Sequence, residues 1–104
     1  MERAKLSKKA VTEFLELYLG GSHLSGFKYL AHVISTQEYN NLYGNTSKDL
    51  NVNYKHIERS IRYYFSHVEK EMGKEKFINI LNLKPDMKLS NKNIIGQITT
   101  MLEK

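Results

Sequence analysis

Three cationic side chains in the middle of this chain share the spacing of one helix face. Lys55, Arg59 and Arg62 are separated by four and then three residues, which places them along one side of a helical cylinder. Lysine and arginine bind the phosphates of nucleic acids, and arginine can also donate two hydrogen bonds to O6 and N7 of a guanine. The chemistry that this spacing predicts is therefore recognition of a polyanion.

The helix that would carry these cations, residues 54–68, also has a regular apolar face. Apolar residues recur at helical spacing and predict one buried stripe: Ile57, Ile61, Tyr64, Phe65 and Val68. A helix with one face in the core and a basic face outward is typical of a DNA recognition helix. An ordinary helical pair whose charged residues face water gives the same pattern and is the alternative.

A short helix and a turn are predicted directly before it. Thr46 or Ser47 can cap the short helix by accepting a hydrogen bond from a backbone N–H, and Leu50 is its expected core anchor. Asn51-Val52-Asn53 follows as a turn, because asparagine tolerates a left-handed backbone. Val52 is expected to pack inward. A helix, a three-residue turn and a helix make the spacing of a helix-turn-helix unit.

Composition narrows the class of protein. The 104 residues suffice for one domain, 1–104, with 40% hydrophobic residues and a formal charge of +5, which suits a protein that meets a polyanion with one face. The absence of cysteine removes disulfides and thiol chemistry and fits a cytoplasmic protein. No long apolar run predicts a membrane helix, and the charged start, MERAKLSKKAV, does not resemble a signal peptide.

Catalysis is not expected from the remaining residues. The four histidines are scattered, and none pairs with a carboxylate at metal-site spacing: His23, His32, His56 and His67. Gly20-Gly21-Ser22 lacks the lysine and the spacing of a phosphate-binding P-loop. We therefore expect no catalytic residue, no metal, no cofactor and no small-molecule ligand.

The other helices are predicted from apolar periodicity. Residues 2–19 form the first, with an i+4 ladder of Leu6, Ala10, Phe14 and Tyr18 beside Val11, Leu15 and Leu19. Gly20-Gly21 ends it, because glycine adopts the left-handed cap conformation readily. The second runs from Gly26 to about Tyr39 after an N-cap at Ser25, and its apolar set is Phe27, Leu30, Ala31, Val33 and Ile34.

The C-terminal third holds the ambiguous stretch. Residues 74–83 suit a short helix with Phe77, Ile78, Ile80 and Leu81 inward and Asn79 and Asn82 outward. A wing hairpin made from residues 77–83 and 87–90 is the alternative, because Lys84-Pro85-Asp86 signals a turn. A last helix, 92–102, follows a cap at Ser90 or Asn91 and buries Ile94, Ile95, Ile98, Met101 and Leu102. The fold class expected is an all-α bundle of five to six helices around a central helix-turn-helix.

Three stretches carry a resemblance to a known family. They are residues 26–34 (GFKYLAHVI), the pair Leu42-Tyr43, and residues 56–62 (HIERSIR). In order and approximate spacing they resemble the motifs G-x-x-Y-L-x-x-A-I, L-Y and R-V-E-R-A-I-R of the DNA-binding effector domain of the sporulation master response regulator of endospore-forming bacteria. The resemblance covers residues 22–68 well and the rest loosely. It implies about six helices and sequence-specific duplex binding, with two copies commonly arranged along the DNA.

Positions that match the family motifs imply roles in DNA binding, and differences from the motifs limit what can be carried over. Glu58, Arg59 and Arg62 fall where the family's Glu and Arg contact bases or phosphates, and a Glu can accept from cytosine N4. An ion pair between Glu58 and Arg62 at i+4 is the alternative. His56 replaces an arginine, so a changed DNA preference is expected. Tyr63 falls where the family has a smaller or polar residue. No phosphorylated receiver module fits within 104 residues, so the sequence is an excised domain or a stand-alone relative. Met1 and the well-patterned first helix favour a stand-alone relative, for which regulation by phosphorylation is not expected.

The expected partner is double-stranded DNA, bound by a homodimer that forms in solution or on the DNA. Phosphate contacts are expected from Lys48, Lys55 and the start of the recognition helix, with Tyr54 and Tyr63 against the backbone. The function expected is transcriptional regulation. An accessory role at a plasmid or phage origin and a protein–protein interaction module are the alternatives. The full set of expected DNA-contacting residues is Thr46, Ser47, Lys48, Asn53, Tyr54, Lys55, His56, Glu58, Arg59, Arg62 and Tyr63.

Overall fold

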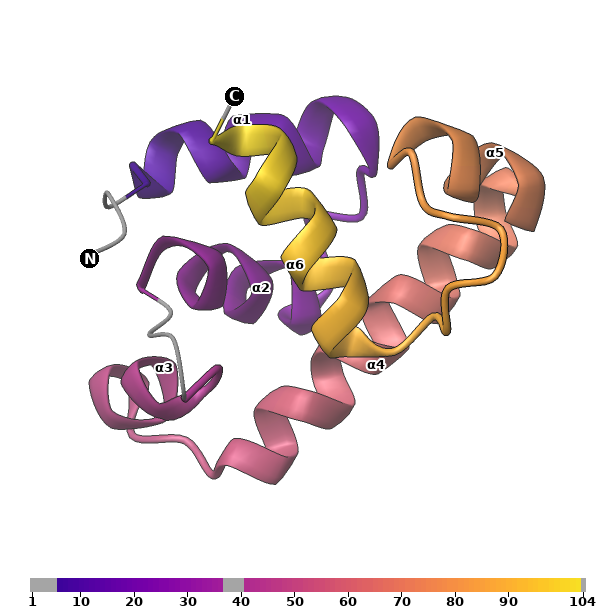
Figure 1. Cartoon of the computed structure of the whole chain (residues 1–104). Helices are drawn as coiled ribbons and strands as arrows, with labels where there is room; N and C mark the ends of the chain where they lie inside the picture. Colours follow the sequence, from indigo (N-terminus) through magenta and orange to yellow (C-terminus); the bar gives the residue numbers. More distant parts are fainter. Residues whose placement is uncertain (1–5, 37–40, 104) are drawn as a thin grey trace.

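The structure, a computed structural model, describes residues 6–36 and 41–103, and α-helices account for most of them (Figure 1). The helices are α1 (Lys8–Tyr18), α2 (Ser25–Thr36), α3 (Gly44–Leu50), α4 (Tyr54–Met72), α5 (Lys74–Ile80) and α6 (Asn91–Leu102). They form a compact bundle without strands in the described ranges, which confirms the predicted all-α class. Within these ranges, no helix combines the length and the apolar character needed to cross a membrane.

The crossing of α2 over α4 forms the centre of the bundle. Gly26 lies at the crossing, where a Cβ atom would come within 2.6 Å of the Tyr64 Cβ and still closer to the carbonyl oxygen of Ser60. The missing side chain therefore lets two backbones approach closely. Around this point Leu30 and Ile61 are fully buried, and α1, α3, α5 and α6 pack around the pair.

Tyr64 joins the crossing to the turn after α1. Its hydroxyl donates a hydrogen bond of 2.7 Å to the carbonyl oxygen of Gly20, and its ring meets Phe27 edge to face at 5.9 Å. Burial raises the pKa of the Tyr64 phenol above its usual value, so the hydroxyl stays protonated and available as a donor. Gly20 and Gly21 both have positive φ, at 69° and 71°, as their predicted role in ending the first helix requires.

Replacing Tyr64 by phenylalanine should lower the free energy of unfolding by about 1 kcal/mol, because a partly buried carbonyl loses its donor while the ring stays packed. Urea unfolding followed by circular dichroism measures the change. Tyr63→Phe is the matched control, because the Tyr63 side chain is 63% exposed and its hydroxyl has no protein partner among the described residues. Equal stability of both variants would contradict the role given to the Tyr64 hydroxyl.

α1 is shorter than predicted, and only one of its two predicted apolar rows is fully buried. It begins at Lys8, where Ser7 caps it by accepting from the Ala10 N–H; the predicted residues 2–5 lie outside the described part of the chain. Val11, Leu15 and Leu19 are buried, whereas Ala10 and Tyr18 of the expected ladder are exposed. Two neighbouring rows could each have faced inward. Contact with α2 buries the row that contains Val11.

The wing predicted as an alternative near residues 77–90 is wrong. α5 is helical, and Phe77, Leu81 and Leu83 are buried while Asn79 is exposed. A strand would alternate and turn Asn79 to the same side as Phe77 and Leu81, so burial follows the helical period. Asn82, with φ of 53°, reverses the chain direction after α5.

The predicted boundaries of α2 and α6 shift slightly. Ser25 is the first helical residue of α2 and not its N-cap, and the predicted end near Tyr39 lies outside the described residues. Ser90 caps α6 by accepting from the Asn93 N–H. The expected apolar residues of α2 are buried, and in α6 the three isoleucines are buried while Met101 and Leu102 are half-buried.

Candidate nucleic-acid interface

The turn between α3 and α4 is fixed by polar side chains. Asn51 adopts the left-handed conformation with φ of 52°, as the sequence predicts. The Ser47 hydroxyl donates a 2.6 Å hydrogen bond to the carbonyl of Val52, and the Asn53 side chain accepts from the Lys55 N–H at 2.8 Å and caps α4. Val52 packs partly inward, as expected. The side chains of Ser47 and Asn53 therefore fix the geometry of the turn between α3 and α4.

The expected role of Thr46 is wrong. α3 begins at Gly44, so Thr46 and Ser47 lie inside the helix and neither caps it. Thr46 is fully buried, and its hydroxyl has no hydrogen-bond partner among the described residues; it cannot reach DNA. The earlier start of the helix turns Thr46 inward, where it replaces the half-buried Leu50 as the buried residue of α3.

α4 presents its basic residues directly away from the core. The five apolar residues predicted to face inward are all buried: Ile57, Ile61, Tyr64, Phe65 and Val68. Lys55, Arg59 and Arg62 are exposed on the opposite side. Because α4 continues to Met72, Ser66 and Lys70 extend the same exposed row.

Arg62 is the one member of this row that is paired within the described residues. Its Nη2 lies 2.9 Å from Oε1 of Glu58, one turn earlier. The alternative role of Glu58 as an i+4 partner is therefore the one found in the structure. Both side chains remain accessible, with 66% of Arg62 and 36% of Glu58 exposed, so water still screens the pair.

Aromatic rings border the row on the side of α2. Tyr63 stacks on His67 at 6.3 Å, and His23, from the connection after α1, meets His67 edge to face at 6.0 Å. Nearer the start of the helix, His56 meets Tyr29 of α2 edge to face at 5.7 Å. These contacts restrain Tyr63 and His56 while leaving both exposed.

The start of α4 and the neighbouring α3 hold the remaining expected contacts. Lys48 is exposed, and Tyr54 is 51% exposed with its ring 6.3 Å from Tyr43. Asp49 carries the one negative charge of α3, and its carboxylate bonds the His32 Nε2 at 3.0 Å. This contact joins α3 to α2 and keeps the carboxylate occupied.

Asn91 is a positioning residue that sequence reasoning missed. It was expected only as a possible cap, yet its side-chain amide donates to the carbonyl of Glu58 at 2.9 Å and to the hydroxyl of Tyr43 at 3.3 Å. Burial raises the pKa of the Tyr43 phenol, so the phenol oxygen remains a neutral acceptor. Asn91 thus ties the start of α6 to α4 and to the residue that directly precedes α3. No local pattern could reveal contacts that span 33 and 48 residues.

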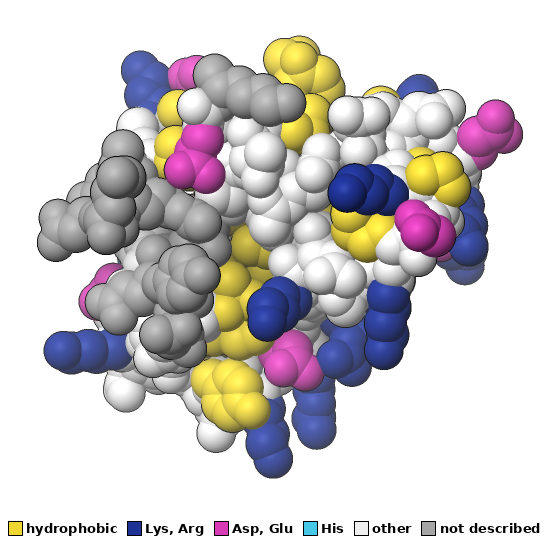
Figure 2. Space-filling model, viewed as in Figure 1, with side chains coloured by type: hydrophobic (Ala, Val, Ile, Leu, Met, Phe, Trp, Pro, Cys, Tyr) yellow, Lys and Arg dark blue, Asp and Glu magenta, His cyan; other side chains and the backbone are white. Residues whose placement is uncertain are grey.

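Charged side chains are unevenly distributed on the face that Figure 2 shows. Figure 2 shows Lys and Arg side chains gathered along the lower and right edges of the molecule, over α4 and the segment that leads from α5 to α6. The upper part of the same view carries fewer of them. On this face, cationic side chains therefore gather over α4 and the segment that follows α5.

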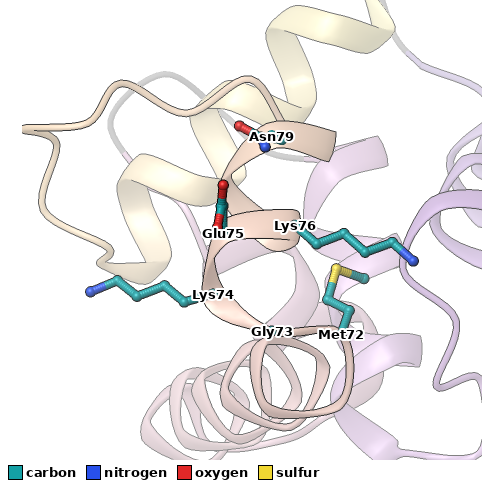
Figure 3. Close-up of a pocket in the computed structure, with 6 residues that line it drawn as sticks. All are labelled: Met72, Gly73, Lys74, Glu75, Lys76 and Asn79. Carbon is teal, nitrogen blue, oxygen red and sulfur yellow. The ribbon is translucent and has the colours of Figure 1, made fainter.

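A hollow at the corner between α4 and α5 offers no comparable chemistry (Figure 3). Its lining is Met72, Gly73, Lys74, Glu75, Lys76 and Asn79. Lys74 and Lys76 extend from it in opposite directions, with Glu75 between them in sequence. Within the described ranges, no group of three His, Asp or Glu side chains could hold a metal ion.

Comparisons with models of protein families, with curated proteins and with solved structures find no match for this chain. The resemblance to the sporulation regulator therefore rests on the three motifs alone and stays a prediction.

Proposed function

We propose that this protein binds double-stranded DNA in a sequence-specific manner, with the N-terminal half of α4 in the major groove and without catalysis. The observation that carries the proposal is the exposed row of Lys55, Arg59 and Arg62, which lies opposite a fully buried row on the same helix. Lys55 and Arg59 form no ion pair with any described residue. A major groove about 12 Å wide accepts an α-helix. The exposed row of this helix would present mostly hydrogen-bond donors to the bases.

Each residue of the interface has a distinct proposed task. Arg59, in the centre of the exposed row, reads a base edge, most simply a guanine. Lys48 and Lys55, on either side of the α3–α4 turn, contact phosphates and set the position of the helix. Tyr54 and Tyr63 lie against the sugar-phosphate backbone. Ser47 and Asn53 act indirectly, because their side chains hold the turn.

We further propose that the protein acts as a homodimeric transcriptional regulator in the bacterial cytoplasm. One helix end reads only a few base pairs, and paired half-sites about one helical turn apart multiply the specificity. The direct test is selection of bound sequences from a random duplex pool, followed by titration of the best site and a scrambled site at several salt concentrations. A defined motif supports the proposal, and its half-site spacing gives the dimer geometry. Absence of binding at low salt would refute the proposal.

Lys55→Ala should weaken binding to the selected and scrambled duplexes alike. If Lys55 neutralises one phosphate, its loss lowers the magnitude of the slope of log K against log salt by about 0.9. Fluorescence anisotropy at four or more salt concentrations measures the slope. Lys9→Ala is the control, because Lys9 is exposed on α1, away from α4. A slope unchanged from the wild type would reject the phosphate contact.

A further inference from the structure

The segment from α5 to α6 and the first turn of α6 carry a second row of lysines. Lys84, Lys88 and Lys92 are all exposed, and no ion pair within the described residues engages them. The only carboxylate between Lys84 and Lys92 is Asp86, so positive charge prevails by three to one. The segment between α5 and α6 holds only part of the alternative wing, and it is an irregular connection and not a hairpin.

Two side-chain hydrogen bonds fix the backbone around Lys88 and Lys92. Asn91 donates to the carbonyl of Glu58 at 2.9 Å and so docks the start of α6 on the N-terminal half of α4. Asn93 donates to the carbonyl of Lys88 at 2.9 Å and folds the preceding segment onto the same end of α6. The backbone of Lys88 and Lys92, on either side of Asn91 in sequence, is thereby held beside the N-terminal half of α4, and Figure 1 shows this segment reaching α4 where α6 begins.

We propose that Lys84, Lys88 and Lys92 form a second phosphate-binding surface, which contacts the backbone of the duplex on the α6 side of the groove that α4 enters. The inference rests on the proposed function. A helix in the major groove has a phosphate backbone along each side, and on this side the backbone meets lysines. Lysine suits the task, because a flexible stem carries its point charge to a phosphate without a fixed geometry.

The two sides of α4 therefore differ. On the α2 side the helix is bordered by rings, with His23 near His67 and Tyr29 near His56. On the α6 side the nearest carboxylate of α4 is Glu58, and Arg62 already pairs with it. Asp86 is the remaining negative charge of the connecting segment. The lysine row is thus the main electrostatic feature facing the backbone on that side.

The test compares the wild type with the double variant Lys88→Gln/Lys92→Gln on the selected site and on a scrambled duplex. Both side chains are exposed, so the fold should be unaffected, and thermal unfolding checks this. Loss of two phosphate contacts should lower the magnitude of the salt slope by about 1.8 on both duplexes, with the preference between them unchanged. Hydroxyl-radical footprinting should lose protection along the backbone on one side of the site only.

Two controls separate charge and position. Lys88→Arg/Lys92→Arg should keep the wild-type slope, because the charge remains, and Lys9→Gln should keep it because Lys9 lies on α1. If the wild type binds duplex DNA and the double glutamine variant has the same slope and footprint, this surface is overturned while the proposed function stands. If the wild type does not bind duplex DNA even at low salt, both are overturned.

Discussion

Replacing Arg59 by alanine should weaken binding to the selected DNA site by about 1–3 kcal/mol, which is roughly a 5- to 150-fold loss of affinity. Arg59 is exposed in the centre of the basic row, and no acid among the described residues competes for it. A bidentate contact with guanine O6 and N7 would therefore be lost without compensation. Titration of the selected duplex by fluorescence anisotropy at constant salt measures the change.

Binding to the scrambled duplex distinguishes a base contact by Arg59 from a phosphate contact. If Arg59 reads a base, the variant loses the preference for the selected site and binds the scrambled duplex nearly as before. An equal loss on both duplexes would reassign Arg59 to a phosphate. Lys70→Ala is the control on the same helix, because Lys70 extends the exposed row about four turns beyond Lys55, past the part proposed to enter the groove.

Replacing Gly26 by valine should destabilise the fold by about 3 kcal/mol or more, the upper range for overpacking. A Cβ at this position would collide with the Ser60 carbonyl and with the Tyr64 Cβ. Neither atom can rotate away, because one belongs to the backbone and the other is fixed to it. The helices α2 and α4 would have to separate at the centre of the core. Urea unfolding at 25 °C, or loss of cooperative thermal unfolding, detects the change.

Gly96 provides a matched control on another helix. It is exposed on α6, and a Cβ there would meet nothing within 4 Å. Gly96→Ala should therefore raise the free energy of unfolding by about 1 kcal/mol, because alanine favours the helix. Gly26→Ala should already be destabilising, with valine worse. If Gly26→Ala matched Gly96→Ala in stability, the close approach of α2 and α4 would be wrong.

Strong periodicity made much of this fold predictable. In α4 the apolar residues recur over about three turns with polar residues between them, so all five buried positions follow from the sequence. The pair Asn51 and Asn53 predicted the turn, and the structure uses both, one for its left-handed backbone and one as a cap. The local sequence was therefore sufficient to predict the turn and the helix that carry the candidate interface.

The errors arose where the choice depended on distant contacts. In α1 two adjacent apolar rows were equally suited to burial, and only the position of α2 selects Val11 over Ala10. Thr46 looked like a surface cap because the start of α3 was placed too late. No local pattern indicated that Asn91 docks α6, because its partners, Glu58 and Tyr43, lie far away in sequence.

If α4 binds DNA as proposed, Glu58 competes with the DNA for Arg62. Arg62 can contact DNA fully only by leaving a carboxylate 2.9 Å away, and an exposed pair of this kind is worth up to about 1 kcal/mol. A lone phosphate oxygen offers little more than Glu58 already does, whereas a guanine accepts two hydrogen bonds. Arg62 would thus remain with Glu58 while the protein slides along unrelated DNA, and would exchange partners only at a sequence that rewards the exchange.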